Sequence, residues 1–442
     1  MRAICPKPYH CGKFIDKYFR YAYKKEYVHR ENNPVKRLKA LIMVNTQNSN
    51  THAFYTPARL GPILFLALLF FLSFIARVVL SPLMPAIETE LSISHSQAGA
   101  LFLFMSLGYF IALLGSGFLS ARITHKYSIV VSTTVVGVAL LVIASSRDLL
   151  ALRAAIFFLG MAAGLYLPSG MTTITDMVDS RHWGKAVSIH EIAPNLGFVA
   201  APIIAEILML WFSWRVVPTV IGYAAICIGL LFARVGKWGN FPGHPPSFSA
   251  VKCVFAKKSF WIMVGLFGLA ISSTMGIYTM LPLYLIKEIG MSGGLANSLI
   301  SLSRLAGMGT ALISGWATDR FGAARTIMWG FLLTGITTIL LGMVASKSTA
   351  AVMVFLQAIL ATIYFPAGFT ALSSLFTADI RNVAISFTIP FAFVFGSGIV
   401  PSMIGYTGDM GAFSTGFAIT GMMILAGAAL PLFLKLTPDP SC

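Results

Sequence analysis

The chain has 442 residues, of which 57% are hydrophobic and only 11% are charged. A soluble protein of this length needs far more charged side chains to cover its surface, so the composition excludes that class. Nearly half of the formal net charge of +17 lies in the N-terminal tail, and no larger basic patch follows. This distribution argues against nucleic-acid binding.

Residues 1–58 form a basic and aromatic N-terminal tail, with 11 Lys or Arg and 3 Asp or Glu. The tail lacks the apolar core of a secretory signal. An interfacial helix on anionic lipid, a disordered tail and a misassigned start upstream of Met43 all remain open, and the weak periodicity favours the last two. Cys5, His10 and Cys11 lack the spacing and fourth ligand of a metal site, so we expect no metal.

Beyond the tail, twelve apolar segments approach the length of about 20 residues that a helix needs to cross a bilayer. They form two sets of six, which cover 61–83, 98–120, 128–146, 149–173, 187–211 and 216–233, and then 260–286, 295–317, 326–345, 350–374, 383–405 and 412–434. We therefore predict an all-α membrane protein with twelve transmembrane helices. Its parts are six-helix bundles at 59–233 and 260–435, a central loop at 234–259 and a C-terminal tail at 436–442.

The basic residues of the loops indicate the orientation. The ends on the side of Arg59 and the central loop carry fourteen Lys or Arg, whereas the opposite ends carry four. Because basic loops remain in the cytoplasm, we predict that both termini and the central loop are cytoplasmic and that the protein lies in the cell (inner) membrane.

The two sets of helices contain the same short patterns. Tyr166-Leu-Pro-Ser-Gly170 returns 198 positions later as Tyr364-Phe-Pro-Ala-Gly368, and Pro82 with Glu88 returns 200 positions later. A membrane chain built from two like halves is typical of secondary transporters, which hold their substrate between the halves.

A motif follows the eighth predicted span, and it reads Gly315-Trp-Ala-Thr-Asp319-Arg320-Phe-Gly322-Ala-Ala-Arg325. Its counterpart after the second span keeps Gly117 and Arg122 but has Ala121 at the acidic position. The first of these segments resembles the signature loop of the major facilitator superfamily. Together with the twelve spans and the repeat, the resemblance covers about residues 60–435.

The resemblance implies a role for the motif loop in the outward-facing state. Gly315, Asp319, Arg320, Gly322 and Arg325 would latch one half against the other. Asp319 would meet the N-terminal end of the fifth span near residues 184–187, where the helix dipole is positive. The counterpart loop with Gly117 and Arg122 would latch more weakly, since Ala121 carries no charge.

Three arginines lie within the predicted spans, where a charge costs about 2.5–3.5 kcal/mol and is kept only for a cavity or a partner. Arg304 is central in the eighth span and is our first candidate for substrate binding, with a structural ion pair as the alternative. Arg77 lies in the outer half of the first span, in a context that resembles organic-anion symporters of the superfamily. Arg153 lies early in the fourth span. It either corresponds to the arginine that the superfamily uses in proton transfer at this span, as the resemblance implies, or forms an ion pair with Asp148.

Acids are scarce in the spans. Ala76 stands where such symporters carry an acid, and the fourth span has none after Arg153. Glu191 follows His190, and a buried Glu–His pair can exchange protons near neutral pH, so we predict that this pair couples transport to protons. Tyr166 and Tyr364 either contact substrate or serve helix packing, since each precedes a helix-bending proline.

A guanidinium suits the geometry of a carboxylate or phosphate, so the sequence predicts a secondary transporter that moves a small anion, together with protons, by alternating access. Proton-driven efflux of amphipathic compounds is the alternative. A receptor on the same scaffold that has lost transport is an alternative of another class. No catalytic motif or cofactor motif is present, so we expect no enzyme and no cofactor, and one chain is expected to work as a monomer in the lipid bilayer.

Overall fold

The structure is a computed structural model that describes residues 57–179, 182–245 and 247–434. The predicted tail at 1–58 lies almost wholly outside these residues, as do Cys5, His10, Cys11 and the C-terminal tail. Two compact units are distinguished, 1–60 and 61–442, and the second contains both predicted bundles apart from residues 59 and 60. In the described part of the chain all regular secondary structure is helical.

The first bundle contains six spans. They are built from α3 (Pro57–Val78) with α4 (Leu80–Leu91), α5 (His95–Ser145), α6 (Leu149–Gly164) with α7 (Tyr166–Met177), α8 (Trp183–His190) with α9 (Ile192–Met209), and α10 (Val216–Val235). Ser94 begins α5 as a capping box with Gln97. At 51 residues α5 is about 77 Å long, far more than one bilayer, and it is bent at Thr124 into two spans.

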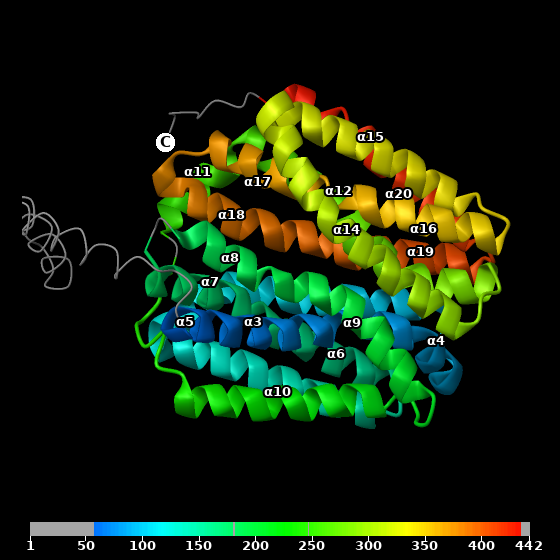
Figure 1. The fold of residues 1–442 in the computed structure, drawn as a ribbon, viewed down its shortest axis with the longest axis horizontal. Helices are drawn as coiled ribbons and strands as arrows, with labels where there is room; N and C mark the ends of the chain where they lie inside the picture. Colours follow the sequence, from blue (N-terminus) through cyan, green and yellow to red (C-terminus); the bar gives the residue numbers. More distant parts are fainter. Residues whose placement is uncertain (1–56, 180–181, 246, 435–442) are drawn as a thin grey trace, which may run out of the picture. The chain divides into compact units, whose positions relative to one another are not determined.

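The second bundle follows the short helix α11 (Phe248–Ala256), which lies within the stretch predicted as a loop. Its spans are built from α12 (Lys258–Ile271), η2 (Ser272–Gly276), α13 (Ile277–Leu283) and η3 (Tyr284–Glu288); α14 (Gly293–Phe321); α15 (Ala323–Gly342); α16 (Lys347–Ala361) with α17 (Tyr364–Leu375); α18 (Ala378–Phe393), η4 (Val394–Ile399) and α19 (Val400–Asp409); and α20 (Phe413–Gly427) with η5 (Leu430–Phe433). Figure 1 shows the two bundles one above the other.

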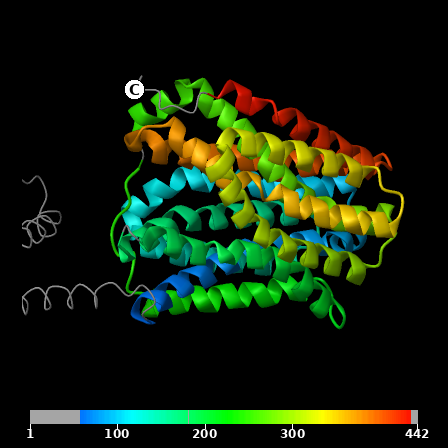
Figure 2. The same ribbon diagram turned by 45° about the horizontal axis from the view of Figure 1, so that its top comes forward.

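The twelve predicted spans agree with this architecture. Ten helical stretches of the described chain are long and apolar enough to cross a membrane. One of them is α5, which holds two spans, and α14 is the remaining span, too polar to qualify by composition. Figure 2 shows that the long helices of the bundles run side by side.

Prolines explain where the spans break. Four interruptions lie four or five residues before a proline, whose missing N–H leaves the carbonyl one turn earlier without its helical partner. The breaks follow Val78, Gly164, His190 and Ala361, and the prolines are Pro82, Pro168, Pro194 and Pro366. The breaks therefore place residues 79, 165, 191 and 363 at bends inside spans.

The two ends of the membrane unit differ. One end, called the loop end here, carries the connection from 236 to 247, whose backbone bonds to the loop of the first bundle through Lys126 N to Gly239 O and His125 N to Phe241 O. The opposite end, called the far end, carries the turns at 92–94, 210–215, 289–292 and 410–412. In Figure 1 the loop end lies to the left and the far end to the right.

Candidate functional site

Arg77, near the end of α3, is buried where the two bundles meet. Its side chain is 4% exposed, and its guanidinium carbon lies 4.6 Å from the ring centre of Tyr109 and 5.0 Å from that of Phe74. The ring of Phe393, from α18 of the other bundle, lies at 5.9 Å. The Arg77 Nε is buried without a hydrogen-bond partner. Aromatic faces thus stabilise this cation, and its Nε–H remains available as a donor.

Arg304, in the middle of α14, has a similar environment at another place. It is 7% exposed, and its guanidinium carbon lies 4.8 Å from the ring centre of Phe198 and 5.0 Å from that of Tyr278. Its Nη2 donates a hydrogen bond of 2.7 Å to the carbonyl of Thr274, within the π-helical turn η2. Phe198 belongs to α9 of the first bundle, so this arginine also reaches across the interface.

The two arginines share one electrostatic feature. Among the described residues, the ion pairs are His95–Glu88, His190–Glu191 and Arg215–Glu90, and none includes Arg77 or Arg304. A buried cation is normally paired, since leaving it unpaired costs several kcal/mol. Two such cations at the interface of two bundles therefore form a site that is complementary to an anion.

A second polar cluster lies on the first bundle, at the break between α8 and α9. His190 is fully buried and stacks on Phe70, with ring centres 4.4 Å apart. Its Nε2 lies 3.1 Å from the Tyr166 hydroxyl, which donates to the carbonyl of Leu66, and its Nδ1 lies 3.4 Å from Glu191. The Glu191 side chain is 47% exposed. The three residues thus form a chain of titratable groups from an exposed carboxylate to a buried phenol.

Comparison with known families identifies the fold. The family model described as "Major Facilitator Superfamily" matches residues 66–318 and 269–441. The chain belongs to the major facilitator superfamily. The resemblance of the Gly315–Arg325 loop is thereby confirmed, as is the prediction of an all-α membrane protein.

Curated relatives of this superfamily member are bacterial transporters. The chain is 24% identical over 366 residues to a protein of Cupriavidus pinatubonensis named "Probable 4-methylmuconolactone transporter", which covers 78% of this chain and 85% of the relative. It is 21% identical over 372 residues to the "Cis,cis-muconate transport protein" of Acinetobacter baylyi, at 81% of this chain and 90% of the relative. A "Probable sulfoacetate transporter" of Cupriavidus necator is 24% identical over 168 residues, 38% of this chain and 39% of that relative.

Solved structures share the superfamily fold. A bacterial homologue of the human lysosomal transporter Spinster, described as inward-facing, superposes with a TM-score of 0.75 at 16% identity over 87% of this chain and 100% of its own. A transporter of the POT family in complex with a peptide reaches a TM-score of 0.71 at 14% identity, over 86% of this chain and 96% of its own.

In each repeated Tyr-x-Pro-x-Gly element the tyrosine packs on the glycine. A Cβ on Gly170 would lie 2.9 Å from the Tyr166 ring, and one on Gly368 would lie 2.5 Å from the Tyr364 ring, so each tyrosine lies over its own glycine. Tyr364 is 2% exposed, stacks on Phe331 and has a hydroxyl without a partner. Both tyrosines are buried against rings of their own bundle, which favours the packing interpretation.

Arg153 lies apart from the other candidates. It is in the second turn of α6, close to the far end, with its guanidinium carbon 5.6 Å from the ring of Phe104. The Asp148 side chain accepts from the backbone N–H of Ala151 and caps α6. No ion pair joins Arg153 to Asp148 in the described part of the chain, and Glu191 lies at a break on another span.

The motif loops lie at the loop end and are open. Asp319, Arg320, Gly322 and Arg325 are exposed, and Arg320 packs over the Trp316 ring. The predicted contact of Asp319 with the start of the fifth span, near residues 184–187, stays a prediction. In the first bundle Arg122 is exposed too, and Gly243 N donates to Ser120 O, so the central connection lies against that loop.

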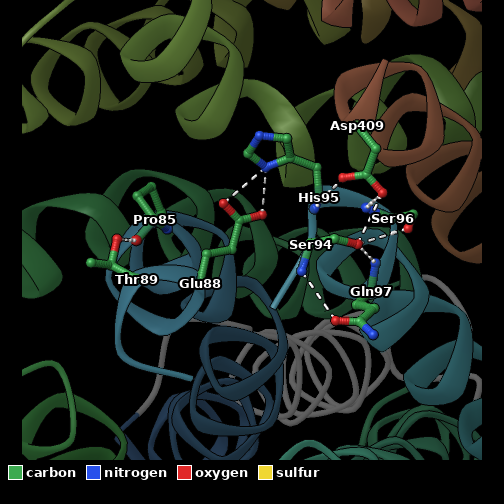
Figure 3. A network of polar contacts seen from close by, with 8 residues as sticks. All are labelled: Pro85, Glu88, Thr89, Ser94, His95, Ser96, Gln97 and Asp409. Carbon is green, nitrogen blue, oxygen red and sulfur yellow. Dashed lines mark hydrogen bonds and ion pairs between the residues drawn. The ribbon is translucent and has the colours of Figure 1, made fainter. Parts of the chain in front are cut away.

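Sequence reasoning missed a polar network at the far end. Asp409, the last residue of α19, accepts hydrogen bonds from the Ser94 hydroxyl and from the backbone N–H groups of His95 and Ser96, at 2.7–3.1 Å. It therefore caps the N-terminus of α5 in the other bundle. His95 Nδ1 lies 2.9 Å from both oxygens of Glu88, and Figure 3 shows the whole cluster. The sequence signals were the capping pattern Ser94–Gln97 and an acid at a helix end.

A related contact lies at the other seam between the bundles. Glu206, near the end of α9, accepts a hydrogen bond of 2.9 Å from Asn297 in the first turns of α14. Its Oε1 lies so close to Gly294 that a Cβ there would be 3.0 Å away. The two seams thus have the same kind of contact. Glu206 of the fifth span meets the N-terminal turns of α14, and Asp409 of the eleventh span meets the N-terminus of α5, each in the opposite bundle.

A surface cavity of about 390 Å³ lies at the far end and is separate from these sites. It is lined by Glu90, Leu91, Ala144, Ser145, Arg147 and Arg215, all from the first bundle. Arg215 there is already bound to Glu90 and to the carbonyls of Ala144 and Ser146. We assign this cavity a structural role.

Proposed function

We propose that the protein is a secondary transporter that moves a small organic anion across the membrane. One observation carries the proposal: Arg77 and Arg304 are buried at the interface of the two bundles, and no carboxylate of the described residues pairs with either. An anionic cargo would supply the missing negative charge. Its oxygens would accept hydrogen bonds from the guanidinium N–H groups in a bidentate fashion. The names of the curated relatives, which refer to muconolactone, muconate and sulfoacetate, support the same cargo class.

The mechanism we infer is alternating access of the two bundles about this site. The contacts described above between the bundles, at Asp409, at Glu206 and around the two arginines, lie between the far end and the middle. At the loop end α7 packs on α5, α6 and α8, and α8 packs on α7 and α9. Because basic residues gather at the loop end, we place it in the cytoplasm, which makes this conformation inward-facing.

Proton coupling is assigned to Glu191 and His190. Glu191 is exposed, and His190 links it to the buried Tyr166 hydroxyl through two contacts of 3.4 and 3.1 Å. Protonation of Glu191 would change its pairing with the imidazole at a helix break, which is a natural hinge. The pair therefore gives a local charge change that can bias the rocking of the bundles.

Uptake into liposomes tests the proposal. Purified protein is reconstituted, and radiolabelled organic anions, sugars and organic cations are offered with and without an inwardly directed proton gradient. We expect saturable uptake of organic anions that increases with the gradient, and no saturable uptake of cations. Uptake confined to cations or amphipathic drugs would favour the efflux alternative and refute the anion assignment.

A further inference from the structure

The two arginines lie in different seams of the bundle interface. Arg77 contacts Tyr109 of α5 and Phe393 of α18, in the seam where α5 packs on α18 and α19. Arg304 contacts Phe198 of α9, in the seam where α9 packs on α14. Each guanidinium thus lies over an aromatic ring of the opposite bundle.

The neighbours of the two guanidiniums do not overlap. Those of Arg77 are Phe74, Tyr109 and Phe393, and those of Arg304 are Thr274, Phe198 and Tyr278. A single carboxylate held by both arginines would need hydrogen bonds of about 2.7–2.9 Å from each guanidinium. In this conformation each guanidinium instead has its own set of partners, in its own seam.

An apolar link connects the two positions. The rings of Phe74 and Phe198 are 5.0 Å apart in a T-shaped pair, and each also contacts one of the arginines. The path from Arg77 to Arg304 thus runs through 5.0, 5.0 and 4.8 Å, and the sum of these steps is the upper limit of their separation. Two cations joined by an aromatic surface match a molecule with two anionic ends and a hydrocarbon middle.

We propose that the cargo is a linear organic dianion that binds at two points, with one anionic group on Arg77 and the other on Arg304. The inference rests on the proposed anion transport and specifies its cargo class. Because the two arginines belong to different bundles, a dianion bridges both halves, whereas a monoanion neutralises only one cation. Specificity for two charges then follows from the desolvation cost of the arginine left unpaired.

Binding to the purified full-length chain tests this inference. The probes are the dicarboxylates succinate, glutarate, adipate and pimelate, with hexanoate as the monoanion that matches adipate in length. Affinities are measured by calorimetry for the wild type, Arg77→Gln, Arg304→Gln and the exposed-site control Arg147→Gln. We expect an optimum of affinity with dicarboxylate length and at least a tenfold preference for adipate over hexanoate in the wild type and the control.

The variants decide between the outcomes. In Arg77→Gln and in Arg304→Gln the adipate-to-hexanoate ratio should fall towards one and the length optimum should vanish, whereas Arg77→Lys and Arg304→Lys should retain part of the preference and so report on folding. Equal affinities for monoanions and dianions in the wild type, or an unchanged ratio in either Gln variant, would overturn two-point binding but leave anion transport standing. If no carboxylate binds at all, the proposed function fails first.

Discussion

Thr124 and Gly322 lie 198 positions apart, at the same place in the two motif loops, and share a backbone conformation. The angles are φ 74° and ψ 163° at Thr124, and φ 85° and ψ 153° at Gly322. This region is essentially reserved for glycine, and other residues in it cost about 1–3 kcal/mol. The Thr124 hydroxyl is also buried without a hydrogen-bond partner. The first loop thus keeps the geometry of the motif although it lost the glycine.

Thr124→Gly should therefore stabilise the protein. Relief of strain exceeds the entropy that glycine adds to the unfolded chain, about 0.4–1 kcal/mol, so a net gain of about 1 kcal/mol is expected. The melting temperature in detergent measures it, and Gly322→Thr, the mirror change, should lower that temperature. A lower melting temperature for Thr124→Gly would show that the loop is not strained.

Interface arginines also illustrate what single residues reveal. Arg304 and Arg77 could be selected from the sequence because a charge inside a span has a high cost. Their aromatic partners could not, since Phe393 and Phe198 lie in opposite bundles and only the docked bundles bring them to the arginines.

At the scale of elements, helix breaks organise the candidate proton site. The break between α8 and α9 falls at Glu191, four residues after Val187, whose carbonyl accepts the Glu191 N–H. Pro194 follows and cannot donate to the carbonyl of residue 190. The sequence predicts part of this arrangement, because Pro194 marks the helix break. It does not predict that His190 stacks on Phe70 and contacts Tyr166, because these residues lie on three spans that only the packed bundle brings together.

Glu191→Gln should uncouple transport from protons. The amide keeps the size and the hydrogen-bonding capacity of the side chain but cannot ionise, so acceleration of uptake by a proton gradient should disappear while anion exchange across the membrane continues. Uptake and exchange assays in liposomes measure the two activities. Glu90→Gln, which changes an acid in the Arg215 ion pair, is the control. Retention of gradient-driven uptake by Glu191→Gln would exclude Glu191 as the coupling group.

At the scale of the whole molecule, acids at opposite ends distinguish the two states. Asp409 and Glu206 bind the opposite bundle at the far end, whereas Asp319 at the loop end is exposed. In the first bundle Ala121 stands at the acidic position, so we expect one acidic latch at the loop end, against the two far-end contacts of Asp409 and Glu206. The superfamily, the helix count and the motif loop could be predicted from the sequence. The far-end contacts could not, because each joins the two bundles, and the contact of Asp409 with Ser94 spans 315 positions of the chain.

Asp409→Asn should shift the protein towards the outward-facing state. The change removes the negative charge that accepts three hydrogen bonds at the N-terminus of α5. Its loss costs about 1–2 kcal/mol, which changes the ratio of inward-facing to outward-facing protein roughly tenfold. Pulsed electron paramagnetic resonance between labels on the far ends of the two bundles measures the shift as a longer distance. Glu90→Gln, an acid of the same end paired within its own bundle, should leave the distances unchanged. Identical distances in Asp409→Asn and wild type would mean that Asp409 does not hold the far end closed.

The central claim is that buried, unpaired arginines between the bundles bind an anionic cargo that the protein carries. The initial rate of organic-anion uptake by liposomes containing wild type, Arg304→Gln or the control Arg147→Gln tests it most directly, at equal amounts of folded protein. We predict that Arg304→Gln lowers the rate at subsaturating anion at least tenfold, whereas wild type and Arg147→Gln agree. Equal rates in all three proteins would contradict the account.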